Sequence, residues 1–159
     1  LTNRHKRGLR HISLAVLSMS AKMGHSQTYF HVTGVQQGSV MGPTLFLLYI
    51  DDLFTLLPPG SAVGYADDVT LVASGDTASA AAAAQQSLLD IVSRWSCDNV
   101  LRLNSVKCTS MCIAPSKRKA TSTCAPALNV NGCPISCVLS VKILGVTFTS
   151  DLDWRLHAQ

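Results

Sequence analysis

The chain has 159 residues, of which 47% are hydrophobic and 14% are charged, and its formal net charge is +4. This length and composition fit one domain with a hydrophobic core, and the net charge is too small to indicate a partner by itself. The longest apolar stretch, residues 45–50, is far shorter than the roughly eighteen residues that span a bilayer. The basic N-terminus is not followed by an apolar segment, so no signal peptide is predicted. We therefore expect an intracellular protein without a membrane span.

Six cysteines could form a disulfide set, but a hydrophobic chain of this length without a secretion signal does not need one. Cys108 and Cys112 are four residues apart, as are Cys133 and Cys137. This is not the spacing of a zinc knuckle, and no histidine lies close in sequence. We expect reduced cysteines in the core or on strand faces, and no zinc site.

The first half of the chain contains two predicted strands and a helix. Residues 12–19 and 28–33 are apolar or β-branched enough for strands, although residues 15–23 also fit a helix. Residues 43–57 are predicted to be helical because their apolar content is high, a proline stands at the start, and Pro-Pro-Gly follows. Asp51 and Asp52 would be exposed residues of this helix.

Two adjacent carboxylates, Asp67 and Asp68, stand between two short apolar runs in residues 64–73. This pattern predicts a β-hairpin whose turn carries the acids. Carboxylate oxygens at a hairpin tip suit Mg²⁺, which keeps waters and substrate phosphates as its other ligands. Aspartates are also common in turns for purely conformational reasons, so the dipeptide alone leaves both interpretations open.

A long helix is predicted over residues 78–100, with Asp76 or Thr77 as its cap. Residues 80–84 have strong helix propensity but little to bury, so they should lie close to a neighbour or be mobile. We expect Trp95 to pack in the core rather than serve as a base-stacking platform. The apolar stripe that should face a sheet is Leu88, Ile91, Val92 and Trp95.

The last third is predicted to be mostly β-structure. Polar and apolar residues alternate over residues 108–113, which predicts a strand. Residues 115–126 are rich in Ser, Thr, Pro and Lys, which predicts a loop. Asn131-Gly132 signals a hairpin, and residues 141–148 a last strand. Together the elements indicate an α+β fold with an antiparallel sheet backed by helices on one face.

Several segments resemble the reverse transcriptase domain of non-LTR retrotransposons. They are Gly-Val-Gln-Gln-Gly-Ser-Val-Met-Gly-Pro at 34–43, Leu-Tyr-Ile-Asp-Asp-Leu at 48–53, and Tyr-Ala-Asp-Asp at 65–68. Leu-Asn-Ser-Val-Lys at 103–107 is similar to the family's Leu-Asn-x-x-Lys, and Lys-Ile-Leu-Gly-Val at 142–146 to its Lys-Tyr-Leu-Gly-Val hairpin. Residues 1–7 and 152–157 are similar to the flanking stretches, so the resemblance covers essentially the whole chain.

The resemblance implies a partial polymerase palm with a fingers remnant at the N-terminus and no thumb. Residues 1–33 would be the end of the fingers and the start of the palm, and residues 34–114 the palm core. Residues 115–127 would be a basic loop, and residues 128–159 a hairpin leading toward the thumb.

The resemblance also implies an RNA-directed DNA polymerase that uses two Mg²⁺ ions, an RNA template, a DNA primer and dNTP. Asp67 is then the main catalytic metal ligand, and Asp68 a second ligand or helper. Tyr65 would lie beside the primer end. Lys107 would assist pyrophosphate departure as a charge or proton donor, with a surface lysine at the end of a helical segment as the alternative.

The glycine-rich segment would contact template and nucleotide. Gln37 would face the incoming nucleotide, Gly38 would allow close backbone approach, and Ser39 belongs to the same predicted binding segment. Gln36 stands where the family usually has Pro, and losing that fixed φ would loosen the turn that aims Gln37.

The family's first block, which supplies the remaining metal-binding Asp, would lie upstream of Leu1, and no Asp or Glu precedes Asp51. We therefore expect a fragment of a longer protein that is inactive alone and works with the upstream palm block, the thumb and an endonuclease. The competing interpretations are a nucleic-acid-binding remnant that holds phosphates through basic clusters, and a decayed copy of an element. These clusters are Arg4, Lys6, Arg7 and Arg10, and Lys117, Arg118 and Lys119.

Overall fold

The computed structural model describes residues 10–21, 40–113 and 127–153. The strand predicted at 28–33, the glycine-rich residues 34–39 and the loop predicted at 115–126 lie outside these ranges. Among the described residues, no helix is both long enough and apolar enough to cross a membrane.

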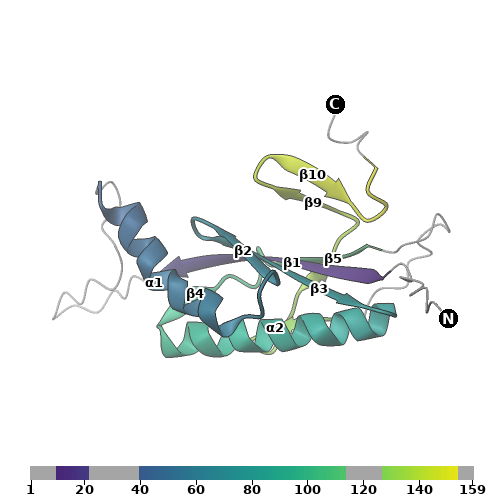
Figure 1. Ribbon diagram of the computed structural model, residues 1–159, viewed down its shortest axis with the longest axis horizontal. Coiled ribbons are helices and arrows are strands. Elements are labelled where there is room, and N and C mark those ends of the chain that lie inside the picture. The colour runs from purple at the N-terminus through teal and green to yellow at the C-terminus, as the bar shows by residue number, and fades with distance from the viewer. Residues whose placement is uncertain (1–9, 22–39, 114–126, 154–159) are drawn as a thin grey trace, which may run out of the picture.

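A six-stranded, mainly antiparallel sheet forms the centre of the fold (Figure 1). Its strand order is β2-β3-β1-β5-β8, and β4 pairs with the end of β1. Only β5 and β8 run parallel. The strands are β1 (His11–Ala21), β2 (Ala62–Tyr65), β3 (Asp68–Gly75), β4 (Leu101–Leu103), β5 (Thr109–Ile113) and β8 (Ser136–Cys137).

Two helices accompany this sheet, as the sequence predicts. Helix α1 (Gly42–Leu56) has a proline in its first turn, and α2 (Ala78–Asp98) runs along one face of the sheet (Figure 1). The Thr77 hydroxyl caps α2 by accepting a hydrogen bond from the Ala80 amide at 3.1 Å. The expected α+β architecture is thus confirmed.

Strand β1 is the longest strand and lies at the centre of the sheet. Residues 11–18 pair with β3, residues 12–16 also pair with β5, and residues 19–21 pair with β4. The pairing with β3 brings the N-terminal strand beside the predicted carboxylate hairpin. Strand β4 was not predicted, because it is only three residues long.

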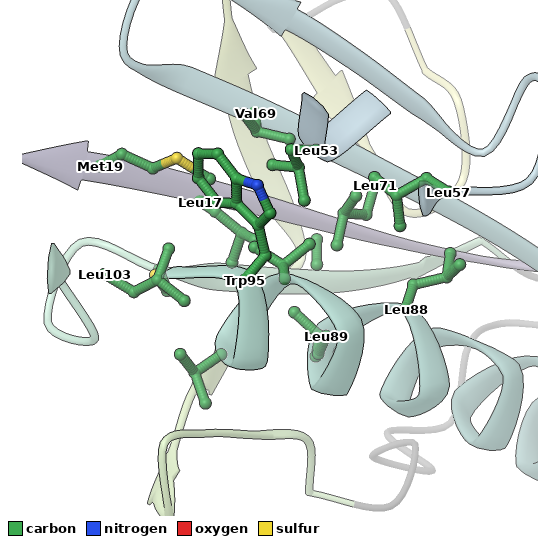
Figure 2. Packing of buried hydrophobic residues seen from close by; sticks show 14 of the residues in the cluster. Leu17, Met19, Leu53, Leu57, Val69, Leu71, Leu88, Leu89, Trp95 and Leu103 are labelled. Carbon is green, nitrogen blue, oxygen red and sulfur yellow. The ribbon is translucent and has the colours of Figure 1, made fainter. Parts of the chain in front are cut away.

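The core lies between the sheet and the two helices, and Figure 2 shows its packing. Trp95 is only 5% exposed, which confirms its predicted place in the core. The N-terminal part of α2 lies close to the sheet, because Ala81 and Ala82 are buried. Alternate residues of β1 and β3 face α2. The core residues include Leu17, Met19, Val69 and Leu71 from the sheet, Leu53 from α1, Leu57 just after α1, and Leu88, Leu89, Val92 and Trp95 from α2.

Two small hairpins complete the described chain. Strands β6 (Asn129–Val130) and β7 (Cys133–Pro134) flank the predicted Asn131-Gly132 turn, where φ is +51° and +77° as a type I′ turn requires.

The second hairpin corrects a prediction. Residues 141–148 were expected to form one strand, but they divide into β9 (Ser140–Ile143) and β10 (Val146–Thr149). Leu144 and Gly145 form the turn between them with φ of +49° and +86°. The hydrophobic pattern missed this turn because leucine rarely adopts positive φ, whereas the resemblance had placed a hairpin here.

Candidate active site

The two predicted site carboxylates lie at a tight turn between β2 and β3. Tyr65 pairs with Asp68, so Ala66 and Asp67 form the turn, and Ala66 adopts a φ of +51°. Asp67 and Asp68 are exposed, and the Tyr65 side chain is 64% exposed. The predicted hairpin is confirmed, and its polar groups are open to a ligand.

The central strand β1 holds this turn in place. The Met19 amide donates a hydrogen bond to the Asp67 carbonyl at 2.9 Å, and Ser18 is the cross-strand partner of Asp68. The carboxylate pair is thereby fixed to the strand that runs through the middle of the sheet. This relation depends on pairing between residues about fifty positions apart in the chain.

The segment that contains Lys107 is attached to the same end of β1. The Asn104 amide donates to the Ser18 carbonyl at 3.0 Å, and the Lys107 amide donates to the Asn104 carbonyl at 2.9 Å. Lys107 is exposed and lies in the turn between β4 and β5. Lys107 is thus a surface lysine, as the alternative expected, but it lies in a turn and not at the end of a helical segment.

Burial and two neighbouring charges act on the pKa of the Asp68 carboxyl group. Partial desolvation raises the pKa of its carboxyl group most strongly, and the neighbouring negative charge of Asp67 raises the pKa further. The positive charge of Lys107 lowers it. The pKa of Asp68 is raised overall, and the charge of Lys107 limits that rise.

The carboxylate turn offers some of the ligands that a divalent metal needs. Asp67 and Asp68 provide hard oxygen donors, and Mg²⁺ commonly uses one or two carboxylates with waters and substrate phosphates. Ser18, the cross-strand partner of Asp68, adds a hydroxyl to this surface and not a carboxylate. Across residues 10–21, 40–113 and 127–153 no group of three or more His, Cys, Asp or Glu could hold a metal. These residues fit a single Mg²⁺ shared with substrate, and they do not fit a complete two-metal cage.

Asp51, Asp52 and Trp95 belong to the two described helices and not to the carboxylate turn. Asp51 and Asp52 are exposed on α1, as predicted. Trp95 packs against Tyr49 with ring centroids 5.9 Å apart. The predicted binding residues Gln37, Gly38 and Ser39 lie outside the described part of the chain.

Sequence patterns did not identify Ser18 and Asn104 as neighbours of the site. Asn104 lies inside the Leu-Asn-Ser-Val-Lys segment, which was its only signal. No sequence motif marked Ser18, because only the pairing register of β1 with β3 places it beside Asp68.

Comparison with known proteins identifies the family of the chain. A family model described as reverse transcriptase (RNA-dependent DNA polymerase) matches residues 4–148. The chain is 30% identical over 131 residues to the RNA-directed DNA polymerase from mobile element jockey of Drosophila melanogaster, covering 78% of this chain and 14% of that relative. It is 29% identical over 147 residues to the protein of the same name from Drosophila funebris, covering 88% of this chain and 16% of that relative.

A further relative is the probable RNA-directed DNA polymerase from transposon BS of Drosophila melanogaster, which is 28% identical over 131 residues. The chain thus spans about one seventh of the relatives it matches. The family match covers β1, both helices and the carboxylate hairpin. The chain belongs to the reverse transcriptase (RNA-dependent DNA polymerase) family.

Proposed function

We propose that this chain is part of the palm of an RNA-directed DNA polymerase encoded by a non-LTR retrotransposon. The observation that carries the proposal is the hairpin turn that presents Asp67 and Asp68 beside Lys107, in a chain that matches the reverse transcriptase family. In the whole protein, this part would act on an RNA template, a DNA primer and dNTP. The upstream palm block, the thumb and an endonuclease would belong to the same longer protein.

Each residue has a distinct proposed role. Asp67 and Asp68 would hold Mg²⁺, which stabilises the negative charge of phosphate oxygens when bound. Lys107 adds positive charge near Asp68, where it would favour departure of pyrophosphate. Tyr65 presents an exposed ring on the same face of the sheet as Asp68, which suits packing on a primer sugar or base.

The remaining binding role belongs to the glycine-rich segment before α1. Gln37, Gly38 and Ser39 would contact the nucleotide and template. An intracellular location is part of the proposal, and it agrees with Cys97, Cys108, Cys112 and Cys133 being free cysteines.

Two carboxylates are fewer than two-metal chemistry requires, so we propose that the chain alone does not extend a primer. The test is an extension assay on a primed RNA template with Mg²⁺ or Mn²⁺, comparing the wild-type chain with Asp67→Asn. We expect no extension from either. Robust extension by the wild type that disappears in Asp67→Asn would refute the inactivity and support the assignment of Asp67.

A nucleic-acid-binding role without catalysis is the main competitor. It predicts RNA binding that weakens steeply with salt, does not depend on a divalent metal and is unchanged in Asp67→Asn. The polymerase proposal predicts instead that Mn²⁺ strengthens binding of a primed template and that Asp67→Asn removes this gain.

A further inference from the structure

Helix α1 packs closely against β2, which is the first strand of the carboxylate hairpin. Gly64 immediately precedes Tyr65 and pairs with Val69 of β3. A Cβ atom added to Gly64 would lie 2.4 Å from Cζ and 3.1 Å from Cε2 of Phe54. Such distances are well inside van der Waals contact, so a larger residue at position 64 would require the Phe54 ring or β2 to move.

Phe54 is not a freely exposed ring at this contact. It is half-buried and packs against the main core, next in the chain to Leu53, which is fully buried. Cross-strand partners share a face of the sheet, so the Cβ position of Gly64 lies on the same face as buried Val69. Figure 2 shows Val69 beside Leu53 on that face.

We propose that Phe54 is a positioning residue, which sets the place of Asp67 and Asp68 through its contact with Gly64. The hairpin is held on two sides: α1 supports β2 at Gly64, and β1 holds the turn through the hydrogen bond from Met19 to Asp67. Displacing β2 at Gly64 would move the turn relative to β1. The functional role of the contact between Phe54 and Gly64 rests on the proposed metal-binding role of Asp67 and Asp68.

The first measurement is amide hydrogen exchange, which does not require a metal. The amide hydrogen exchange of Met19 reports whether the Asp67 carbonyl keeps its place. The Val138 amide, which donates to the Ser110 carbonyl at 2.8 Å, is the internal reference on the other side of the sheet. Gly64→Ala should speed exchange at Met19 by about tenfold, as overpacking of a close contact predicts, and leave Val138 unchanged.

Rescue distinguishes a specific contact from general damage. Phe54→Leu shortens the side chain, so the double variant Gly64→Ala with Phe54→Leu should restore the protection of Met19. Gly75→Ala is the matched control, because its Cβ would lie 2.5 Å from the backbone nitrogen of Ala81, and Phe54→Leu should restore nothing there. Equal loss of protection at Met19 and Val138, no loss in Gly64→Ala, or no rescue would each overturn the proposal.

The Mn²⁺ affinity then tests whether the position of the carboxylate hairpin affects metal binding. Gly64→Ala should bind Mn²⁺ about tenfold more weakly than the wild type at equal fraction folded, and the double variant should recover. Unchanged affinity despite faster Met19 exchange would make the contact merely structural and overturn its positioning role. If the wild type shows no Asp67-dependent Mn²⁺ binding, the proposed function fails, while the exchange result still decides whether Phe54 sets the hairpin.

Discussion

Lys107 and Asp68 interact although Lys107 lies in the turn between β4 and β5 and Asp68 is the first residue of β3, and the positive charge of Lys107 lowers the pKa of the Asp68 carboxyl group. Replacing Lys107 with Met removes this charge and should raise the pKa of Asp68. Carboxyl ¹³C chemical shifts followed through a pH titration measure the change. Lys142→Met, in β9, is the control and should leave the Asp68 titration unaltered. An unchanged pKa in Lys107→Met would show that the two groups do not interact.

Asp68→Asn should stabilise the fold at neutral pH. The pKa of Asp68 is raised above its ordinary value of 3.8, so ionisation of this carboxyl opposes folding. This unfavourable effect is absent well below pH 3.8 and complete once the pH exceeds the raised value. Melting temperatures should therefore be higher for Asp68→Asn than for the wild type at pH 7 and should converge at acidic pH. A lower Tm for the variant at pH 7 would contradict this sign.

Gln85 and Gln86 of α2 should respond in opposite ways to the same substitution. Gln85 is fully buried, and among the described residues neither its amide nitrogen nor its amide oxygen has a hydrogen-bond partner. Gln85→Met removes two unsatisfied polar atoms at similar volume and should raise the free energy of unfolding by about 1 kcal/mol.

The neighbouring glutamine is the control. The Gln86 side chain donates to the Asn129 carbonyl at 3.0 Å and accepts from the Asn129 amide at 2.9 Å. Gln86→Met should lower the free energy of unfolding by about 1 kcal/mol. Urea denaturation measures both changes, and destabilisation by Gln85→Met would show that Gln85 has a partner in solution.

Gly75→Ala should destabilise the protein at the junction of β3 and α2. The added Cβ would lie 2.5 Å from the Ala81 nitrogen and 2.8 Å from the Ala80 carbonyl carbon, and backbone atoms cannot swing away as a side-chain tip can. The expected loss is about 1–3 kcal/mol. Ser74→Ala, at the exposed preceding residue, should change stability by less than about 0.5 kcal/mol. Similar stabilities for both variants would exclude close packing at Gly75.

The sequence predicted those features that depend on local chemistry. Thr77 caps α2, Pro43 stands in the first turn of α1, and the Asn131-Gly132 turn adopts the expected dihedral angles. The carboxylate hairpin could be predicted because two apolar runs bracket Asp67 and Asp68.

Features that depend on long-range pairing could not be predicted in this way. The placement of Ser18 beside Asp68 and the contact of Phe54 with Gly64 join residues from separate elements. Leu144 was missed as a turn residue because its positive φ contradicts its local preference. Local patterns specify elements, whereas register and packing specify which of their residues meet.

We propose that Asp67 and Asp68 form a divalent-metal site, and a Mn²⁺ titration followed by electron paramagnetic resonance measures binding at that site. We predict saturable binding of about one Mn²⁺ per chain, competed by Mg²⁺, which is lost in Asp67→Asn and kept in Asp51→Asn on the exposed face of α1. Absence of saturable Mn²⁺ binding in the wild type, or equal binding by Asp67→Asn, would show that the two aspartates do not form a metal site.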